Sequence, residues 1–232
     1  RDGPAFDIGC SMFVVRCLLS GHKPAAGLTP ENFAMDAPFQ PQLVMQRPHL
    51  SGLPPIVLPA GGSIRAMRGP EDDAAWDRIY GDSFGNAQPA GSFDRLMRPD
   101  AAFREDRVLF LCLDSELVAT ASAWFAPKYG EQIGFLHYVG VLKAHAGHGF
   151  GLQVSLACLH KMTAEGRTSA RLQTDDFRLP AIKQYLRLGF APLLIHENQR
   201  ARWREVLTQL GGPALVDQHA VALTGALCSE NG

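Results

Sequence analysis

The most informative stretch of this sequence is Val139-Gly-Val-Leu-Lys-Ala-His-Ala-Gly-His-Gly-Phe-Gly151. It joins an apolar strand pattern to a helix pattern through alternate glycines. Glycine allows a tight turn and leaves backbone N–H groups exposed where a helix begins. These N–H groups and the positive end of the helix dipole together bind phosphate. Lys143, His145 and His148 add positive potential nearby. A turn that only packs strand against helix remains the structural alternative.

Strand and helix patterns alternate on both sides of this glycine loop. Short apolar runs rich in β-branched residues predict strands, and periodic runs with helix start and stop signals predict helices. We expect strands at 63–68, 107–113, 117–125, 133–142, 169–174 and 190–195, and helices at 71–84, 151–165, 179–188 and 197–210. This order predicts an α/β fold, with a mixed sheet flanked by helices. The loop follows the carboxyl end of a strand, where open sheets bind ligands.

The first 60 residues differ from the rest because prolines interrupt them repeatedly. We interpret them as an irregular N-terminal extension and linker that precedes the folded domain. The expected division is an extension at 1–60, a domain at 61–212 and a tail at 213–232, with a strand or helix at 13–19, a short helix from Thr29 and an extended linker at 48–59. The extension could be an arm for a homodimer or a lid over the substrate.

Composition and charge exclude several classes of protein. A chain of 232 residues with 46% hydrophobic and 19% charged residues is typical of a globular protein, not of a disordered or coiled-coil one. Its 22 basic and 23 acidic residues nearly cancel, so no overall field attracts nucleic acid or an anionic membrane. The apolar stretch near the start is too short for a membrane span. We expect a cytoplasmic protein whose five cysteines are reduced thiols.

The glycine stretch resembles the acyl-CoA loop of the GNAT acetyltransferase superfamily, Val-x4-[Arg/Gln]-x-x-Gly-x-[Gly/Ala]. Val141, Ala146, Gly149 and Gly151 stand at its four defining places. Ala146 departs from the pattern, because the family usually has a side chain there that helps to hold the pyrophosphate. The backbone amides of the loop remain available for that purpose.

A second segment resembles the family's other signature, Asn-x-x-Ala-x3-Tyr-x3-Gly-Phe. Ala181, Tyr185, Gly189 and Phe190 match it, and Arg178 replaces the asparagine. The two motifs occur in the right order, and the resemblance covers roughly residues 63–195. It implies a GNAT-like, mostly antiparallel central sheet. It also implies that the strand feeding the loop diverges from the strand near residue 169, which leaves a wedge for the pantetheine arm of coenzyme A.

The resemblance implies an N-acetyltransferase that uses acetyl-CoA as its co-substrate and contains no metal. It would move an acetyl group directly, in a ternary complex, to a primary amine of a small molecule, amino acid or peptide. The expected cofactor-binding residues are Val139, Gly140, Val141, Ala146, Gly147, His148, Gly149, Phe150, Gly151 and Arg178. An acyl-CoA binding or sensing module that has lost its chemistry is the alternative, because two motif positions have changed.

Two residues are candidates for catalysis. His137 lies nine residues before Ala146, where the similar serotonin N-acetyltransferases carry a catalytic histidine, and an imidazole pKa of about 6.5 suits a base. Tyr185 stands where the family often has a tyrosine that protonates the coenzyme A sulfur. Each could instead be an ordinary packed residue. The backbone N–H of Val139 is the expected oxyanion donor.

Two further pairs have open interpretations. His145 and His148 have an H-x-x-H spacing that some metal sites use, but beside an anion site we expect them to face solvent or phosphate. Asp175 and Asp176 follow a strand and could attract a cationic amine or cap the next helix.

Overall fold

The structure is a computed structural model that describes residues 40–85 and 89–229. The elements expected at 13–19 and from Thr29 lie outside these residues. The described residues from Gln42 onward form one compact unit. Among the residues described, no helix combines the length and the apolar content that a membrane span requires.

The described elements follow one another along the chain as strands, α-helices and short 3-10 helices. They are β1 (Leu43–Arg47), β2 (Gly62–Ala66), η2 (Pro70–Asp72), α2 (Asp73–Phe84), α3 (Ser92–Leu96), η3 (Glu105–Arg107), β3 (Val108–Leu113), β4 (Glu116–Phe125), η4 (Pro127–Tyr129), β5 (Ile133–Val141), η5 (Lys143–His145), α4 (Phe150–Ala164), β6 (Ser169–Thr174), α5 (Leu179–Arg187), β7 (Ala191–Leu193), α6 (Gln199–Gln218) and α7 (Ala220–Thr224).

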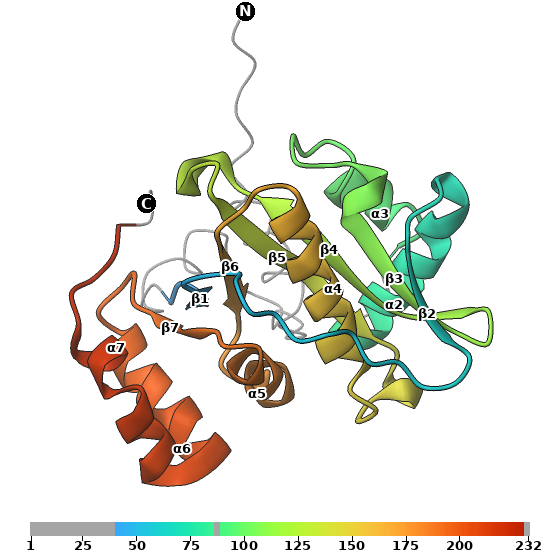
Figure 1. Ribbon diagram of the computed structural model, residues 1–232. Helices are drawn as coiled ribbons and strands as arrows, with labels where there is room; N and C mark the ends of the chain where they lie inside the picture. The colour runs from blue at the N-terminus through green and yellow to red at the C-terminus, as the bar shows by residue number, and fades with distance from the viewer. Residues whose placement is uncertain (1–39, 86–88, 230–232) are drawn as a thin grey trace, which may run out of the picture. The chain divides into compact units, whose positions relative to one another are not determined.

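The described strands form one seven-stranded sheet in the order β2-β3-β4-β5-β6-β1-β7. All neighbours are antiparallel except β5 and β6, which are parallel. The predicted α/β fold, with a mixed and mostly antiparallel sheet flanked by helices, is confirmed. Figure 1 shows this sheet with α4 on the side of the viewer.

Side chains alternate between the two faces of β5, as the period of a strand requires. A Cβ atom added to Gly134 would lie 2.5 Å from the sulfur of Met162, so this position faces α4. Trp124 and His137 face the other way, toward the aromatic cluster that includes Trp76 of α2. The helices α2 and α4 therefore cover opposite faces of the sheet.

Strand β1 differs from the expected division of the chain. It lies inside the segment assigned to the extension, yet it pairs with β6 from Leu43↔Thr174 to Arg47↔Ala170 and with β7 on its other side. Leu43, Val44 and Met45 are almost fully buried. The sheet therefore begins well before residue 61, although the domain division as a whole stays a prediction.

The segment 48–61 runs from β1 across α4 to β2, at the other end of the sheet (Figure 1). It has no helix or strand. The amide nitrogen of Val57 donates to the Gln153 side chain at 2.9 Å, and the Nε2 atom of His160 donates to the Pro54 carbonyl at 2.9 Å. Both partners lie on α4, so this segment is held against the helix that the glycine loop opens.

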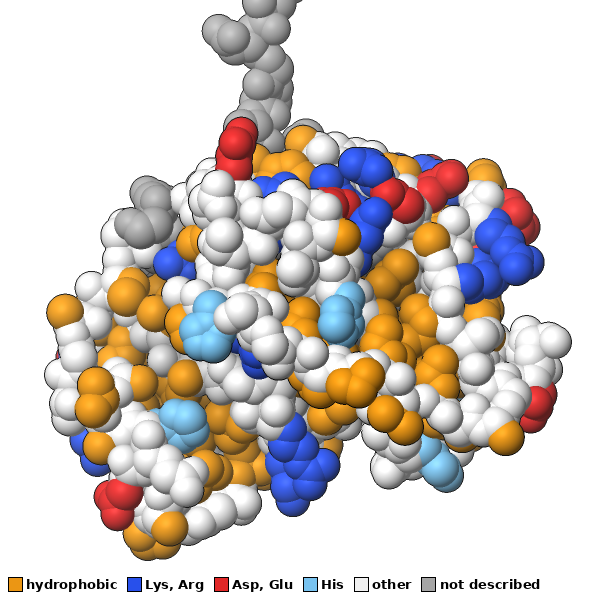
Figure 2. Space-filling view, in the orientation of Figure 1, with side chains coloured by type: hydrophobic (Ala, Val, Ile, Leu, Met, Phe, Trp, Pro, Cys, Tyr) orange, Lys and Arg blue, Asp and Glu red, His pale blue; other side chains and the backbone are white. Residues whose placement is uncertain are grey.

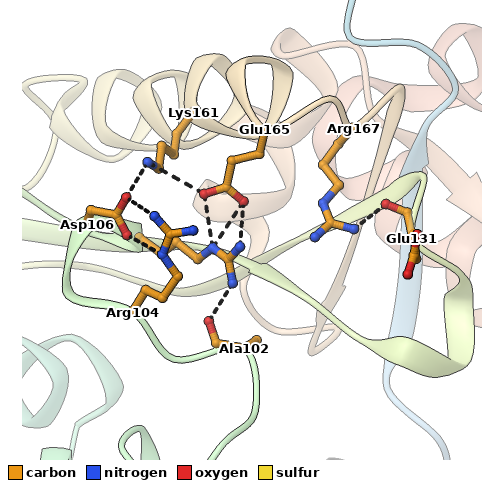
Figure 3. A network of polar contacts seen from close by, with 8 residues as sticks. Ala102, Arg104, Asp106, Glu131, Lys161, Glu165 and Arg167 are labelled. Carbon is orange, nitrogen blue, oxygen red and sulfur yellow. Dashed lines mark hydrogen bonds and ion pairs between the residues drawn. The ribbon is translucent and has the colours of Figure 1, made fainter.

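A network of charged side chains ties the end of α4 to the start of β3 (Figure 3). Arg107 is buried, and its Nη2 atom lies 2.9 Å from Oε2 of Glu165. Its Nη1 atom donates to the carbonyl of Ala102 at 2.9 Å. Lys161 joins the network through Asp106 at 2.7 Å. This network lies at the opposite end of α4 from the glycine loop, so it stabilises the fold without touching the loop.

The charged side chains visible from this side belong to both signs. Figure 2 shows acidic and basic side chains close together in the upper part of the view, while the middle is mainly apolar or uncharged. This face carries no broad patch of a single sign.

Candidate active site

The parallel strands β5 and β6 pair over only three residues. Their register runs from Ile133↔Ser169 to Phe135↔Arg171, although β5 continues to Val141 and β6 to Thr174. Beyond Phe135 the two strands have no pairing with each other. The expected wedge between these strands is therefore present, at the carboxyl ends where the glycine loop begins.

A β-bulge interrupts β5 at the wedge. Thr120 pairs with Gly140 and Ser122 with His137, so two residues of β5, Tyr138 and Val139, oppose one residue of β4. Tyr138 has φ 46°, in the left-handed region that a tyrosine rarely adopts. Such bulges often re-aim side chains next to active sites.

The bulge places the rings of His137 and Tyr138 on one face, with centroids 3.9 Å apart. An aromatic row on α2 borders this face, because Trp76, Tyr80 and Phe84 follow one another at intervals of four residues. The ring of Tyr138 contacts Trp76 and Tyr80 edge-on. Sequence reasoning missed Tyr138, since no glycine or asparagine marks its left-handed conformation.

The glycine loop has the backbone shape that anion binding requires. Gly147 and Gly149 have φ 84° and 79°, and Gly149 is the N-cap of α4. No side chain caps this helix, and its first turn contains no acidic residue. A Cβ atom on Gly149 would meet nothing within 4 Å, whereas one on Gly151 would lie 2.7 Å from the Gln184 amide oxygen. The first amides of α4 are therefore available to an anion.

The basic residues of the loop do not converge on one point. Lys143 lies near Asp82, with its Nζ atom 3.9 Å from a carboxylate oxygen. The Nε2 atom of His145 lies 3.7 Å from Glu116, and the ring of His148 stacks on Phe150. Within the described part of the chain, no three His, Cys, Asp or Glu residues are grouped as metal ligands would be.

His137 is buried among aromatic rings. Its ring lies 5.5 Å from that of Phe135 and 6.1 Å from that of Trp124, measured between centroids. Burial lowers the pKa of His137 to about 3, because no nearby charge compensates for the loss of water. The imidazole is therefore neutral at physiological pH and only a weak base.

Tyr185 is buried on α5, with its ring 6.1 Å from that of Phe190. Burial raises the pKa of Tyr185 to about 12, against an opposing effect of the Arg178 charge. The phenol is therefore protonated at physiological pH and can donate a proton or a hydrogen bond.

Arg178 and the two aspartates are engaged with one another or with a neighbour. The Nε atom of Arg178 lies 3.1 Å from Asp175, and its guanidinium carbon lies 3.9 Å from the centroid of the Phe84 ring. Asp176 makes a bidentate pair with Arg202 at 2.6 and 3.0 Å. Neither aspartate caps α5, whose N-cap is Arg178. Both carboxylates are thus neutralised by arginines.

The sequence of this central part matches a known family. Residues 74–190, about half of the chain, match the acetyltransferase (GNAT) family. The chain belongs to the GNAT acetyltransferase family. The matched part of this GNAT chain extends from the start of α2 to Phe190, and so includes the glycine loop, His137 and Tyr185. Strands β1 and β2 and helices α6 and α7 lie outside the match.

Relatives of the GNAT chain include proteins named as mycothiol acetyltransferases. It is 28% identical over 160 residues to the mycothiol acetyltransferase of Kytococcus sedentarius, covering 66% of this chain and 54% of that protein. It is 30% identical over 147 residues to the mycothiol acetyltransferase of Nocardia farcinica, covering 60% and 48%. The chain therefore spans about half the length of these relatives.

A solved structure shares the GNAT fold. The GCN5-related N-acetyltransferase from Sphaerobacter thermophilus superimposes with a TM-score of 0.53 and 22% identity. The similarity covers 66% of this chain and 49% of that one. It shows that the mixed sheet described above is a GNAT-like fold.

Proposed function

We propose that this chain transfers an acetyl group from acetyl-CoA directly to a primary amine. The observation that carries the proposal is the combination of an uncapped helix N-terminus on α4 with a wedge between β5 and β6, in a chain of the GNAT family. The first feature suits a diphosphate and the second suits a narrow, extended arm. Together they aim a thioester at the bulge on β5.

The loop and the end of β5 would hold the cofactor. The proposed contacts come from the backbone amides at 146–151 and from the end of β5, at Val139, Gly140 and Val141. The methyl side chain of Ala146 offers the diphosphate no charge or hydrogen bond, so the amides and the helix dipole supply the binding. Acetyl-CoA supplies the activated acetyl group. Everything else in the reaction falls to residues of this chain and to the acceptor.

His137 would take the proton that the acceptor nitrogen loses. With a pKa of about 3, its imidazole cannot deprotonate a free ammonium ion efficiently. The nitrogen becomes more acidic once it bonds to the carbonyl carbon, which narrows the pKa difference that the proton transfer to His137 must overcome. We therefore assign His137 this later proton, with the amine entering in its neutral form.

Tyr185 would supply the proton for the departing sulfur. Its pKa of about 12 keeps the phenol protonated until the thiolate appears. The backbone N–H of Val139, beside the strained Tyr138, would stabilise the oxyanion on the acetyl group. The nitrogen–carbon bond forms first and gives the tetrahedral oxyanion, which then collapses as the sulfur–carbon bond breaks and releases the amide and the free thiol.

The acceptor is a small-molecule or peptide amine in this proposal. The curated relatives are named mycothiol acetyltransferases, so amines related to mycothiol belong among the acceptors to be tested. A homodimer through residues 1–60, a cytoplasmic location and the lack of nucleic acid or membrane partners stay predictions.

The second candidate function is acyl-CoA binding without transfer. The burial of His137 and the absence of a polar side chain at Ala146 favour it. Tight binding of acetyl-CoA with no turnover on any amine would support this alternative.

The experiment is a thiol-release assay with acetyl-CoA and a panel of primary amines. We expect amine-dependent release of free thiol, with His137→Ala and Tyr185→Phe lowering kcat by about 100-fold or more. His160→Ala is the control, because this histidine lies on α4, where its Nε2 atom donates to the Pro54 carbonyl of the segment 48–61. Unchanged kcat in both His137 and Tyr185 variants would refute the assigned roles. Calorimetry with acetyl-CoA separates lost binding from lost chemistry.

A further inference from the structure

Arg178 presents two terminal nitrogens that make no hydrogen bond to any of the residues that the structure describes. Its Nε atom donates to Asp175 at 3.1 Å. Within the described part of the chain, neither Nη1 nor Nη2 has a hydrogen-bond acceptor, although the side chain is only 21% exposed. A guanidinium carries five N–H donors in a fixed plane, and four of them remain available here.

Two aromatic rings and a carboxylate hold this guanidinium in place. Its central carbon lies 3.9 Å from the centroid of the Phe84 ring and 5.4 Å from that of Phe177. Asp175 is itself fixed, because the Gln42 side chain donates to its other oxygen at 3.0 Å. A stacked, partly desolvated arginine with free terminal nitrogens is preorganised for bidentate binding of a carboxylate or phosphate.

The position of Arg178 indicates which of two anionic groups it binds, a phosphate of the cofactor or a carboxylate of the acceptor. Phe84 belongs to α2, which covers the face of the sheet that carries His137 and Tyr138. The diphosphate is proposed to bind at the start of α4, which covers the opposite face. The terminal nitrogens of Arg178 therefore lie on the side of the sheet where we place the acceptor, and not on the side where we place the diphosphate.

The electrostatic effects of Arg178 agree with this position. Burial raises the pKa of both Tyr80 and Tyr185, and the charge of Arg178 acts in the opposite direction on each. The guanidinium thus lies close enough to influence α2 and α5 at once. Because Asp176 is paired with Arg202, it does not compete with an incoming anion for the guanidinium of Arg178.

We propose that Arg178 binds a carboxylate of the acceptor, and hence that the acceptor is a primary amine bearing a carboxylate, such as an amino acid or an acidic peptide. The inference rests on the proposed acetyl transfer and defines the acceptor class of that same site. Arg178 is then a specificity-determining residue. The usual family asparagine is neutral, so this recognition follows from the arginine.

The test compares acceptors that have the same carbon skeleton and amine and differ only at the carboxylate. Amino acids, their carboxamides and their decarboxylated amines are assayed with acetyl-CoA at equal concentrations of neutral amine. We expect kcat/KM to favour the carboxylates by about 10- to 100-fold over both analogues. Arg178→Met should abolish this preference by lowering kcat/KM for the carboxylates toward that for the carboxamides, and Arg178→Lys should restore part of it.

Arg187→Met is the matched control, because Arg187 is exposed on the same helix. It should leave the carboxylate preference intact. A preference that is absent in the wild type, or that survives in Arg178→Met, overturns the inference. So does a tenfold rise in the Kd of acetyl-CoA in Arg178→Met with an unchanged acceptor preference, since Arg178 would then bind a cofactor phosphate, the role expected from the sequence.

A binding experiment keeps this inference separate from the proposed function. If no amine is acetylated, the transfer proposal fails, and the same carboxylates and carboxamides are titrated calorimetrically into the complex with coenzyme A. Tighter binding of the carboxylate that is lost in Arg178→Met supports the inference. Equal affinities overturn it.

Discussion

His137 couples the stability of the fold to pH. Its folded-state pKa of about 3 lies below the unfolded value of about 6.5. Between these two pH values the unfolded chain binds a proton at this histidine and the folded chain does not. Stability from the neutral imidazole is fully present above pH 6.5 and declines as the pH falls toward 3. We expect the wild type to lose about 1.4 kcal/mol per pH unit more than His137→Gln between pH 6 and 4. Urea unfolding at several pH values measures this difference.

The control for this pH effect is His160→Gln. His160 lies on the surface of α4, so its replacement should leave the steep pH dependence in place. If the wild type and His137→Gln lost stability in parallel, the buried histidine would not be the source.

The same residue shapes the pH dependence of the rate. A base that is already neutral adds no titration near pH 6.5, so only deprotonation of the acceptor ammonium should limit kcat/KM. We expect log kcat/KM to rise with a slope of one from pH 5.5 to 8. A slope of two below pH 6.5 would show that a group of ordinary histidine pKa must also lose its proton.

Individual residues were predictable from the sequence only where a local motif marks them. Gly149 and Gly151 stand in a spaced pattern, and both have the backbone or packing requirement that explains glycine there. Tyr138 has no such mark, because its left-handed φ results from pairing between two whole strands. The stacking of Arg178 on Phe84 joins residues far apart in the chain, which no local pattern reveals.

At the scale of elements, α4 offers an internal comparison of its two ends. Gly149 precedes the helix and Gly166 follows it, both with φ near 80° and both with open space for a Cβ atom. We expect Gly149→Ala and Gly166→Ala to lower the free energy of unfolding by a similar amount, about 1–2 kcal/mol. Only Gly149→Ala should raise the Kd of acetyl-CoA, by about tenfold, because it reshapes the amides of the loop. Calorimetry and urea unfolding measure the two effects, and equal Kd changes would contradict the assignment.

The charged network at the far end of α4 should affect stability alone. Arg107→Met leaves the half-buried Glu165 without its main partner, and we expect a loss of about 2 kcal/mol in the free energy of unfolding. Arg104→Met removes a more exposed partner of Asp106 and should cost less than about 1 kcal/mol. The acetyl-CoA affinity should be unchanged in both variants. A weaker affinity in Arg107→Met would mean that the two ends of α4 are coupled.

Elements were predictable where the apolar pattern is long or a turn is explicit. The hairpin of β3 and β4, the strand β5 and the helix α4 follow the sequence pattern to within a few residues. Strand β1 could not be found in this way, because five residues among prolines acquire a strand conformation only by pairing with β6 and β7. The expected helix at 197–210 continues as α6 to Gln218, across a kink at Gly211 and Gly212.

At the scale of the whole molecule, the position of β1 sets the limit for shortening the chain. We expect a variant lacking residues 1–39 to unfold cooperatively and to bind acetyl-CoA as the full chain does. A variant lacking residues 1–47 should lose cooperative unfolding, because Leu43, Val44 and Met45 are buried between two strands. Thermal unfolding with calorimetry compares the three proteins.

The shorter deletion also tests the two roles considered for the extension. If removal of residues 1–39 abolishes dimerisation, the segment is an arm between subunits. If it changes acceptor preference, the segment is a lid. Cooperative unfolding after removal of residues 1–47 would show that β1 is dispensable to the sheet.

The insertion of β1 between β6 and β7 also has a consequence for synthesis on the ribosome. Of the strands described, β1 emerges first and its two neighbours emerge last. Its apolar side chains must therefore remain unpaired while β3, β4 and β5 form their local hairpins, and non-local pairing of this kind is slow. The nascent chain would therefore expose an apolar, unpaired segment during most of translation. We expect chaperones that bind such exposed segments to recognise it.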